Sequence, residues 1–194
     1  MKNIKILKEQ KATAFITKYD KPLGTLEQLF YIFIICAFIG WTLETVYCSY
    51  LFGEYIERGF LFGPLCPIYG FGVILLLLVL KPYAKNNILL FLISAVVFTA
   101  FEYIVGFMLD AIFGLKFWDY SNDMYQINSR ITLWMCFAWG LLGLIFMHYI
   151  YPTIQKIFDK TIYKLKYPIQ HIVVLTLFIA FILDTILSTI KYLS

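Results

Sequence analysis

The chain contains few charged residues. Asp, Glu, Lys and Arg make up only 14% of its 194 residues, whereas hydrophobic residues make up 61% and the mean hydropathy is +0.79. An average soluble domain carries about 25% charged residues. This shortage excludes an ordinary soluble globular fold and indicates an integral membrane protein.

Motifs for metal, nucleotide and nucleophile chemistry are also missing. The four cysteines and two histidines show no CxxC or Cys/His spacing that would suggest a metal site. The chain has no GxxxxGK[ST] loop, so any ATP-driven step requires a separate chain. His148 and His171 lie near those ends of their apolar segments that are far from the acids Glu44, Glu102 and Asp184. The sequence therefore gives little support to a Ser/His/Asp arrangement. We therefore expect no metal, no cofactor and no catalytic residues, and we do not expect an enzyme.

Long apolar runs dominate instead. A helix needs about 20 mainly apolar residues to cross a hydrocarbon core of about 30 Å. The second run is the shortest, and Pro64, Pro67 and Gly70 predict an irregular start that protein or water must cover. The sequence predicts an all-α polytopic membrane bundle of about five transmembrane helices, at residues 26–51, 65–80, 88–112, 131–151 and 169–190.

Basic residues indicate the orientation of the bundle. Residues 1–24, 81–87 and 152–168 hold six, two and four Lys or Arg residues, and the opposite side holds only four. The positive-inside rule then predicts a cytoplasmic N-terminus and an outside C-terminus in the plasma membrane, which we expect to be bacterial. Because the net charge of +4 arises from this asymmetry, it gives no support to a nucleic-acid partner.

Two of the basic segments have amphipathic patterns. Residues 1–24 lack the apolar core of a signal peptide and predict either a helix on an anionic membrane surface or a solvated tail. Residues 152–168 place Ile154 and Phe158 on one helical face and lysines on another, which predicts a helix lying on the membrane or against a partner. We assign the remainder, residues 25–194, to a single transmembrane domain.

Two halves of this domain share a pattern of one acid followed by one arginine. Glu44 lies inside the first apolar run and Arg58 opens the second, while Glu102 lies inside the third and Arg130 opens the fourth. Both halves are hairpins that start inside and return, so we interpret them as a parallel repeat, with a site expected at the interface between the repeats. Repeat one covers about 26–80 and repeat two about 88–151, and the fifth span lies outside both.

Carboxylates inside apolar runs are candidates for function, because an unpaired charge in hydrocarbon costs several kcal/mol. Glu44, Glu102 and Asp184 should all lie in one half of the bilayer, where Arg58 and Arg130 enter. This arrangement predicts a polar cavity that opens outward. Glu44 can pair with Arg58 or cross to Arg130. The second outer loop adds two further candidates that could bond an arginine or a ligand headgroup, Asp119 and Asn128.

Two sequence blocks carry a resemblance to a known family. The first is Arg58-Gly59-Phe60-Leu61-Phe62-Gly63-Pro64 followed by Pro67-Ile68-Tyr69-Gly70, and the second is Trp118-Asp119-Tyr120-Ser121 followed by Asn128 and Arg130. With these blocks the chain resembles the ABC-transporter type IV family of membrane proteins over about residues 28–190. Two departures are Glu57, where that family commonly has Asn, and Ser129, where it usually has Gly. The resemblance implies a permease and specifies neither a substrate nor an ATPase partner.

Three functions remain open on the sequence alone. The leading hypothesis is a transport or permease-type protein that binds a small polar or amphiphilic ligand, or a lipid headgroup, between Glu44, Arg58, Glu102 and Arg130. The second is a membrane scaffold or assembly subunit, in which the Glu/Arg pairs only lock the helices together. The third is an enzyme that modifies lipid at the outer leaflet, for which no nucleophile is recognisable. Beyond the lipid bilayer and an ATPase, the partner considered is a second copy of the chain in a homo-oligomer.

Overall fold

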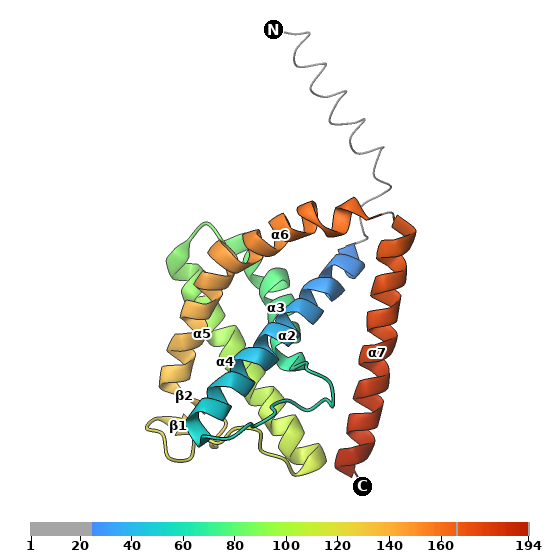
Figure 1. Ribbon diagram of the computed structural model, residues 1–194. Helices are drawn as coiled ribbons and strands as arrows, with labels where there is room; N and C mark the ends of the chain where they lie inside the picture. Colours follow the sequence, from blue (N-terminus) through green and yellow to red (C-terminus); the bar gives the residue numbers. More distant parts are fainter. Residues whose placement is uncertain (1–24, 166, 194) are drawn as a thin grey trace, which may run out of the picture.

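The computed structural model describes residues 25–165 and 167–193, so the interfacial helix predicted for residues 1–24 lies outside the described residues. The structure is almost entirely helical (Figure 1). Its single two-stranded antiparallel sheet joins Gln126 to Thr132 and Ile127 to Ile131 in the described part of the chain. The elements are α2 (Thr25–Phe52), α3 (Pro67–Leu80), α4 (Asn87–Phe113), β1 (Gln126–Ile127), β2 (Ile131–Thr132), α5 (Leu133–Ile145), α6 (Tyr151–Lys160) and α7 (Tyr167–Leu193). The predicted all-α membrane bundle is confirmed.

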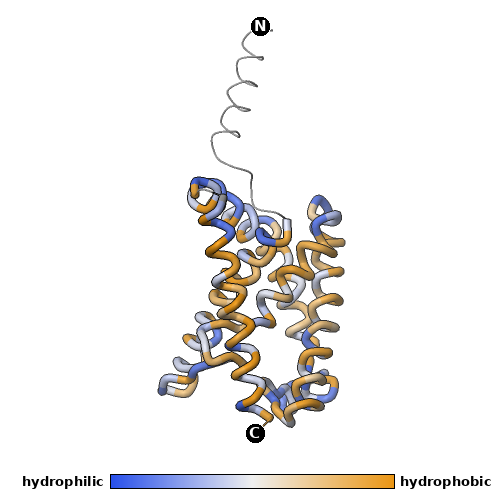
Figure 2. The backbone as a smooth tube through the Cα atoms, turned by 90° about the vertical axis from the view of Figure 1, so that its right-hand side faces the viewer, coloured by the Kyte–Doolittle hydropathy of each residue, from blue (hydrophilic) through white to orange (hydrophobic). Residues whose placement is uncertain are grey.

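Among the described residues, four helical segments are long and apolar enough to cross a membrane, namely Thr25–Phe52, Asn87–Phe113, Leu133–Lys164 and Pro168–Leu193. A fifth apolar segment, Pro67–Tyr83, is shorter. Figure 2 shows hydrophobic residues along the middle of the helices and hydrophilic residues at both ends of the bundle. This distribution is that of a chain whose central band faces hydrocarbon.

Helix α3 is too short to cross a membrane alone. Its 14 residues extend about 21 Å. It begins beside the middle of α2, because the N–H of Cys66 donates a hydrogen bond of 3.0 Å to the carbonyl of Ala37. Residues 53–66, which form no helix, cover the remaining distance from the end of α2. The irregular start predicted from Pro64 and Pro67 is thus present, and residues 53–66 are called the entry segment below.

Two helical hairpins, α2–α3 and α4–α5, form the body of the protein. Helices α2 and α4 both end at a glycine in the left-handed region, Gly53 with φ of 72° and Gly114 with φ of 65°. In each case the glycine N–H donates to the carbonyl four residues earlier, at Ser49 and Asp110. This is the usual way for a helix to stop, because glycine adopts the positive φ without a Cβ clash.

Close helix contacts within each hairpin depend on further glycines. A Cβ on Gly70 of α3 would lie 2.5 Å from the ring of Phe33 on α2, and a Cβ on Gly140 of α5 would lie 2.5 Å from the ring of Phe91 on α4. Because no side chain intervenes, the rings pack directly on the neighbouring backbone. Small residues at such crossings are common in membrane bundles.

The fourth predicted span, 131–151, corresponds to β2, α5 and the π-helical turn Phe146–Ile150 that follows α5. Helix α5 passes at Phe146–Ile150 into a π-helical turn, and α6 then lies across the end of the bundle in Figure 1. The apolar face of α6 is buried at Ile154 and Phe158, where Phe158 meets the ring of Tyr31 on α2. The prediction that this segment lies on the membrane or against a partner therefore needs correction, since its apolar face packs on the chain's own core.

Helix α7 stands at the side of the bundle (Figure 1) and packs mainly on α2. Phe178 and Phe181 of α7 contact Phe30 and Phe33 of α2 edge-on, with ring centroids 5.1 to 6.4 Å apart. Below, the end of the bundle at which α7 terminates is called the C-terminal end. The loop between α4 and α5, with β1 and β2, and the end of α2 lie at this end.

Candidate functional site

Glu44 and Arg58 form an ion pair within the first hairpin. Arg58 donates two hydrogen bonds to Oε1 of Glu44, of 3.3 Å from Nε and 3.0 Å from a terminal nitrogen. The second carboxylate oxygen accepts from the thiol of Cys66 at 3.6 Å. Both charged side chains are about one-quarter exposed. The sequence left open whether Glu44 pairs with Arg58 or with Arg130, and in the structure it pairs with Arg58 of the same hairpin.

Arg58 also links the two hairpins. A terminal nitrogen of its guanidinium donates a 2.6 Å hydrogen bond to the carbonyl of Phe117, in the loop that follows α4. The ring of Phe117 lies in an aromatic cluster with Phe60 of the entry segment and Tyr192 of α7. Arg58 therefore joins α2 and the entry segment to the loop after α4, and the ring of Phe117 in that loop contacts α7.

Glu102 lies in a different environment from Glu44. It is only 5% exposed and accepts hydrogen bonds from the phenol of Tyr120 at 3.0 Å and from the indole of Trp139 at 2.8 Å. Both donors are neutral groups. Burial, followed by the negative charge of Glu102, raises the pKa of the Tyr120 phenol. Tyr120 is therefore a hydrogen-bond donor to Glu102 across the whole physiological pH range.

Arg130 pairs with an acid that the sequence analysis did not select. Its guanidinium lies 2.5 Å from a carboxylate oxygen of Asp110, and neither side chain is more than one-third exposed. The guanidinium carbon also lies 5.8 Å and 5.6 Å from the ring centres of Tyr103 and Phe107. The second hairpin therefore does not reproduce the Glu/Arg pair of the first. The helical spacing puts Asp110 on the same face of α4 as Glu102, but it does not indicate which of the two acids meets Arg130.

The carboxylate of Asp184 accepts hydrogen bonds from backbone N–H groups and does not pair with a cation in the described structure. Its two oxygens accept the N–H groups of Phe62 at 2.9 Å and Gly63 at 2.8 Å, both in the entry segment. The hydroxyl of Ser188, one turn along α7, bonds both Phe62 N–H and Asp184. At its other end the entry segment is held by α2, where Thr45 and Ser49 accept the N–H groups of Arg58 and Ile56. Side chains thus supply partners for backbone that no helix satisfies.

Asp119 and Asn128 organise the loop between α4 and α5. Asp119 is exposed and accepts the N–H of Ser121 at 2.8 Å, and this hydrogen bond holds the pKa of its carboxyl below the ordinary value. Asn128 donates to the phenol of Tyr103 at 2.8 Å and adopts a φ of 51°. Neither side chain contacts Glu44 or Glu102 in the described hydrogen bonds.

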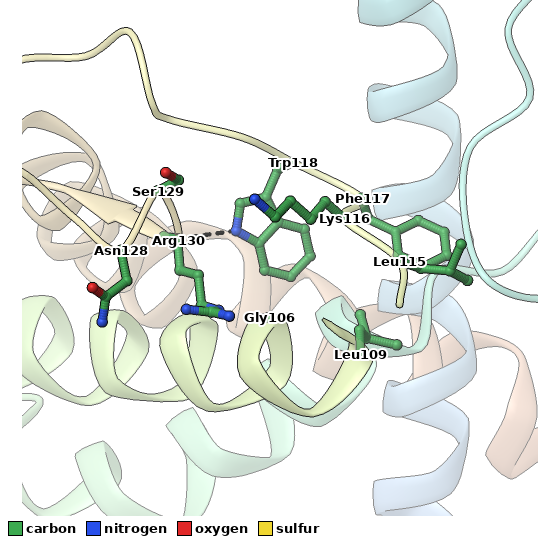
Figure 3. Close-up of a pocket in the computed structure, with 9 residues that line it drawn as sticks. All are labelled: Gly106, Leu109, Leu115, Lys116, Phe117, Trp118, Asn128, Ser129 and Arg130. Atoms are coloured by element: carbon green, nitrogen blue, oxygen red, sulfur yellow. Dashed lines mark hydrogen bonds between the residues drawn. The ribbon is translucent and has the colours of Figure 1, made fainter. Parts of the chain in front are cut away.

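The described recesses do not coincide with the predicted Glu/Arg cavity. The recess in Figure 3 lies between Gly106 of α4 and the loop residues Trp118 and Arg130, and its volume of about 10 Å³ is enough for roughly one water molecule. A larger one lies beside Trp134. Of the seven candidates, only Asn128 and Arg130 line either of these recesses.

Comparison with known proteins gives one match. A sequence model of the family described as "Putative ABC-transporter type IV" matches residues 31–189 of the chain. The chain belongs to this family. No curated protein and no solved structure shows significant similarity to it.

The ABC-transporter type IV match covers every candidate residue from Glu44 to Asp184. The first of the two sequence blocks that carried the resemblance runs from the entry segment into α3, and the second lies between α4 and α5. The hydrogen bond from Arg58 to the carbonyl of Phe117 joins these two regions. The family's sequence blocks therefore correspond to a contact between the two hairpins at the C-terminal end of the bundle.

Proposed function

We propose that the protein is a permease-type subunit of a membrane transport system, in which the buried carboxylate of Glu102 binds part of the transported ligand. The supporting observation is that Glu102 is 5% exposed in a membrane-spanning helix and has neutral hydrogen-bond donors, whereas Arg130 pairs with Asp110. Acids retained inside membrane helices without a cationic partner commonly belong to ligand or ion pathways. The ligand class that fits is a small polar or amphiphilic molecule with a positively charged group.

The proposal includes a parallel repeat of the two hairpins, which equivalent contacts support. Phe91 follows Phe33 by 58 positions, as Glu102 follows Glu44, and Gly140 follows Gly70 by 70 positions. The pairs formed are equivalent as well, because Gly70 packs on Phe33 and Gly140 packs on Phe91. A site between two such halves is the common arrangement in transporters built from repeats.

Neighbouring positions repeat the same correspondence. Tyr69 of α3 packs on Gly40 of α2, and Trp139 of α5 stacks on Phe98 of α4 at 5.4 Å, with the same two offsets along the chain. Trp139 donates a hydrogen bond to Glu102. Tyr69 of α3 and Trp139 of α5 therefore occupy equivalent positions in the helix that follows each acid. The two halves differ in chemistry, because Glu44 of the first half pairs with Arg58, whereas the hydrogen-bond donors to Glu102 of the second half are neutral.

The proposed orientation places the N-terminus in the cytoplasm and the C-terminus outside. The lysines of the 3-10 helix Lys81–Tyr83, of the turn before α4, and of α6 gather at the end opposite the C-terminal end, which agrees with the positive-inside rule (Figure 1). A periplasmic reporter such as alkaline phosphatase should therefore be active when fused after Ser194 and inactive when fused after Tyr83. Active fusion at Tyr83 with an inactive one at Ser194 would reverse the orientation.

An ATPase partner is part of the proposal, because the chain itself has no nucleotide-binding loop. The test is native mass spectrometry of the full chain, purified in mild detergent from its own membranes, alone and as Glu102→Gln. We expect a co-purifying ATPase with both forms and a bound small molecule that only the unaltered chain retains. The same bound molecule on both forms would refute the role of Glu102, and isolation without any ATPase would count against a permease subunit.

A scaffold function is the second candidate, and one observation favours it. Glu44, Asp110 and Asp184 all have partners within the chain, and no described recess includes Glu44 or Glu102. In a pure scaffold, Glu102→Gln would change thermal stability and leave the retained molecules unchanged. Measuring both quantities on the same preparations therefore separates the two functions.

The ion pair of the first hairpin gives a further prediction. Removing one partner of a mostly buried pair leaves the other charge uncompensated. We expect Glu44→Gln and Arg58→Gln each to lower the free energy of unfolding by about 2 kcal/mol, and the double variant to lose less than the sum. Thermal unfolding in detergent of the four forms gives the coupling energy. Additive losses would show that the pair seen at 3.0 Å does not couple the two residues.

A further inference from the structure

A recess lies beside Trp134, away from the acids and arginines described above. It is formed by the tight loop that precedes β1 and by the first turn of α5, and it has a volume of about 570 Å³. Its lining residues include Asn122, Asp123, Tyr125, Leu133, Trp134 and Phe137. The loop with β1 and β2 and the start of α5 lie at the C-terminal end of the bundle (Figure 1).

The backbone that forms this recess is fixed. The buried hydroxyl of Thr132 donates to the carbonyl of Met124 at 3.1 Å, and the N–H of Asp123 donates to the carbonyl of Tyr120 at 2.9 Å. Tyr125 has a φ of 59°, in the left-handed region that side chains other than glycine seldom adopt. Its ring is 75% exposed. A bulky aromatic residue held in this conformation and presented to the surroundings indicates a contact function.

The charge of the recess is negative. Asp123 is its only ionisable residue at neutral pH among the lining residues, and one carboxylate oxygen accepts the indole N–H of Trp134 at 3.1 Å. This bond fixes the carboxylate at the edge of the Trp134 ring and leaves its second oxygen for a ligand. The carboxylate attracts a cation through its charge. An anionic headgroup finds no basic side chain in the lining.

The apolar side of the recess continues into the surface of α5. Phe137, Leu141 and Ile145 follow one another at a spacing of four residues, and each is more than 40% exposed. In a membrane-spanning helix such a stripe faces acyl chains. The recess thus offers a cation site at the level of the headgroups and an apolar path below it.

We propose that this recess binds a phospholipid with a primary-amine headgroup, whose ammonium bonds Asp123 while an acyl chain lies along α5. A primary ammonium is favoured over choline because it donates hydrogen bonds to the free oxygen of Asp123. This site is separate from Glu102 and independent of the transport proposal. The bound lipid would hold the loop before β1 against the membrane surface.

The test uses the full chain in nanodiscs containing equal parts of phosphatidylethanolamine, phosphatidylcholine and phosphatidylglycerol. Native mass spectrometry after release should show phosphatidylethanolamine retained about tenfold over phosphatidylcholine, as expected for a charge-assisted hydrogen bond. Asp123→Asn should abolish this preference. Because the asparagine oxygen can still accept the Trp134 indole, the fold of the loop should persist.

Asp159→Asn provides the matched control, since it removes an exposed carboxylate on α6 at the opposite end of the bundle. It should leave the preference unchanged. Trp134→Leu should reduce the preference, because it removes the indole N–H that fixes the Asp123 carboxylate. Equal retention of the three lipids by the unaltered chain, or an unchanged preference in Asp123→Asn, would overturn the proposal, whatever the outcome for Glu102.

Discussion

Replacing Gly143 with valine is expected to separate α4 from α5. A Cβ on Gly143 would overlap the hydroxyl oxygen of Ser94 and lie 2.5 Å from its Cβ. Ser94 cannot move aside easily, because it is fully buried and its hydroxyl donates to the carbonyl of Leu90 at 2.6 Å. Overpacking in a rigid contact of this kind destabilises by about 3 kcal/mol. Thermal unfolding in detergent should show the loss as a large fall in Tm.

Two comparisons make this result specific. Leu141→Val changes a side chain of the same helix that is exposed to the surroundings, and it should leave Tm nearly unchanged. Combining Gly143→Ala with Ser94→Gly removes the obstructing side chain and should lose less stability than Gly143→Ala alone. A tolerated Gly143→Val would mean that the α4–α5 contact is looser than the structure has it.

The spans were predictable because their signal is local. Apolar runs define α2, α4, α5 and α7, and the proline and glycine residues near Pro67 marked the irregular start of α3. The end of the fourth span had a signal of the same kind, because Pro152 lies in the first turn of α6 and the predicted span stops at residue 151. The sequence did not predict the π-helical turn at Phe146–Ile150, through which helicity continues into α6.

The partners of the acids were less predictable. Helical spacing places Glu102 and Asp110 on one face of α4, and either could in principle receive Arg130. The choice depends on where Arg130 enters, which is fixed by β2 and by Trp118, whose indole bonds the Arg130 carbonyl at 3.0 Å. These constraints come from the folded loop, and no spacing in the sequence encodes them.

Asp184 is another acid whose partners could not be predicted from the sequence. Its depth in α7 was consistent with the predicted acid cluster, yet its partners are two backbone N–H groups. Every residue type except proline can supply a backbone N–H donor, so the partners of Asp184 cannot be identified from the sequence. The only hint was that an extended segment at membrane depth must find acceptors from its neighbours.

Asp184→Ala is therefore expected to release the entry segment from α7. The substitution removes both carboxylate oxygens and leaves the N–H of Gly63 without its partner, while Phe62 keeps only the longer bond of 3.1 Å from its N–H to Ser188. Loss of two charge-assisted hydrogen bonds should lower the free energy of local opening by about 3 kcal/mol. Amide hydrogen exchange in residues 58–66 should then accelerate by about a hundredfold.

The size of this effect tests how the entry segment is held. Ser188→Ala removes one of the two acceptors of Phe62 and should give a smaller acceleration, whereas Thr189→Ala, whose hydroxyl bonds only its own helix at Thr185, should give almost none. If Asp184→Ala leaves exchange in residues 58–66 unchanged, α7 is not what fixes this segment, and the bonds from Thr45 and Ser49 of α2 suffice. If exchange accelerates as expected, a movement of α7 would free the backbone next to Arg58, which couples that helix directly to the ion pair with Glu44.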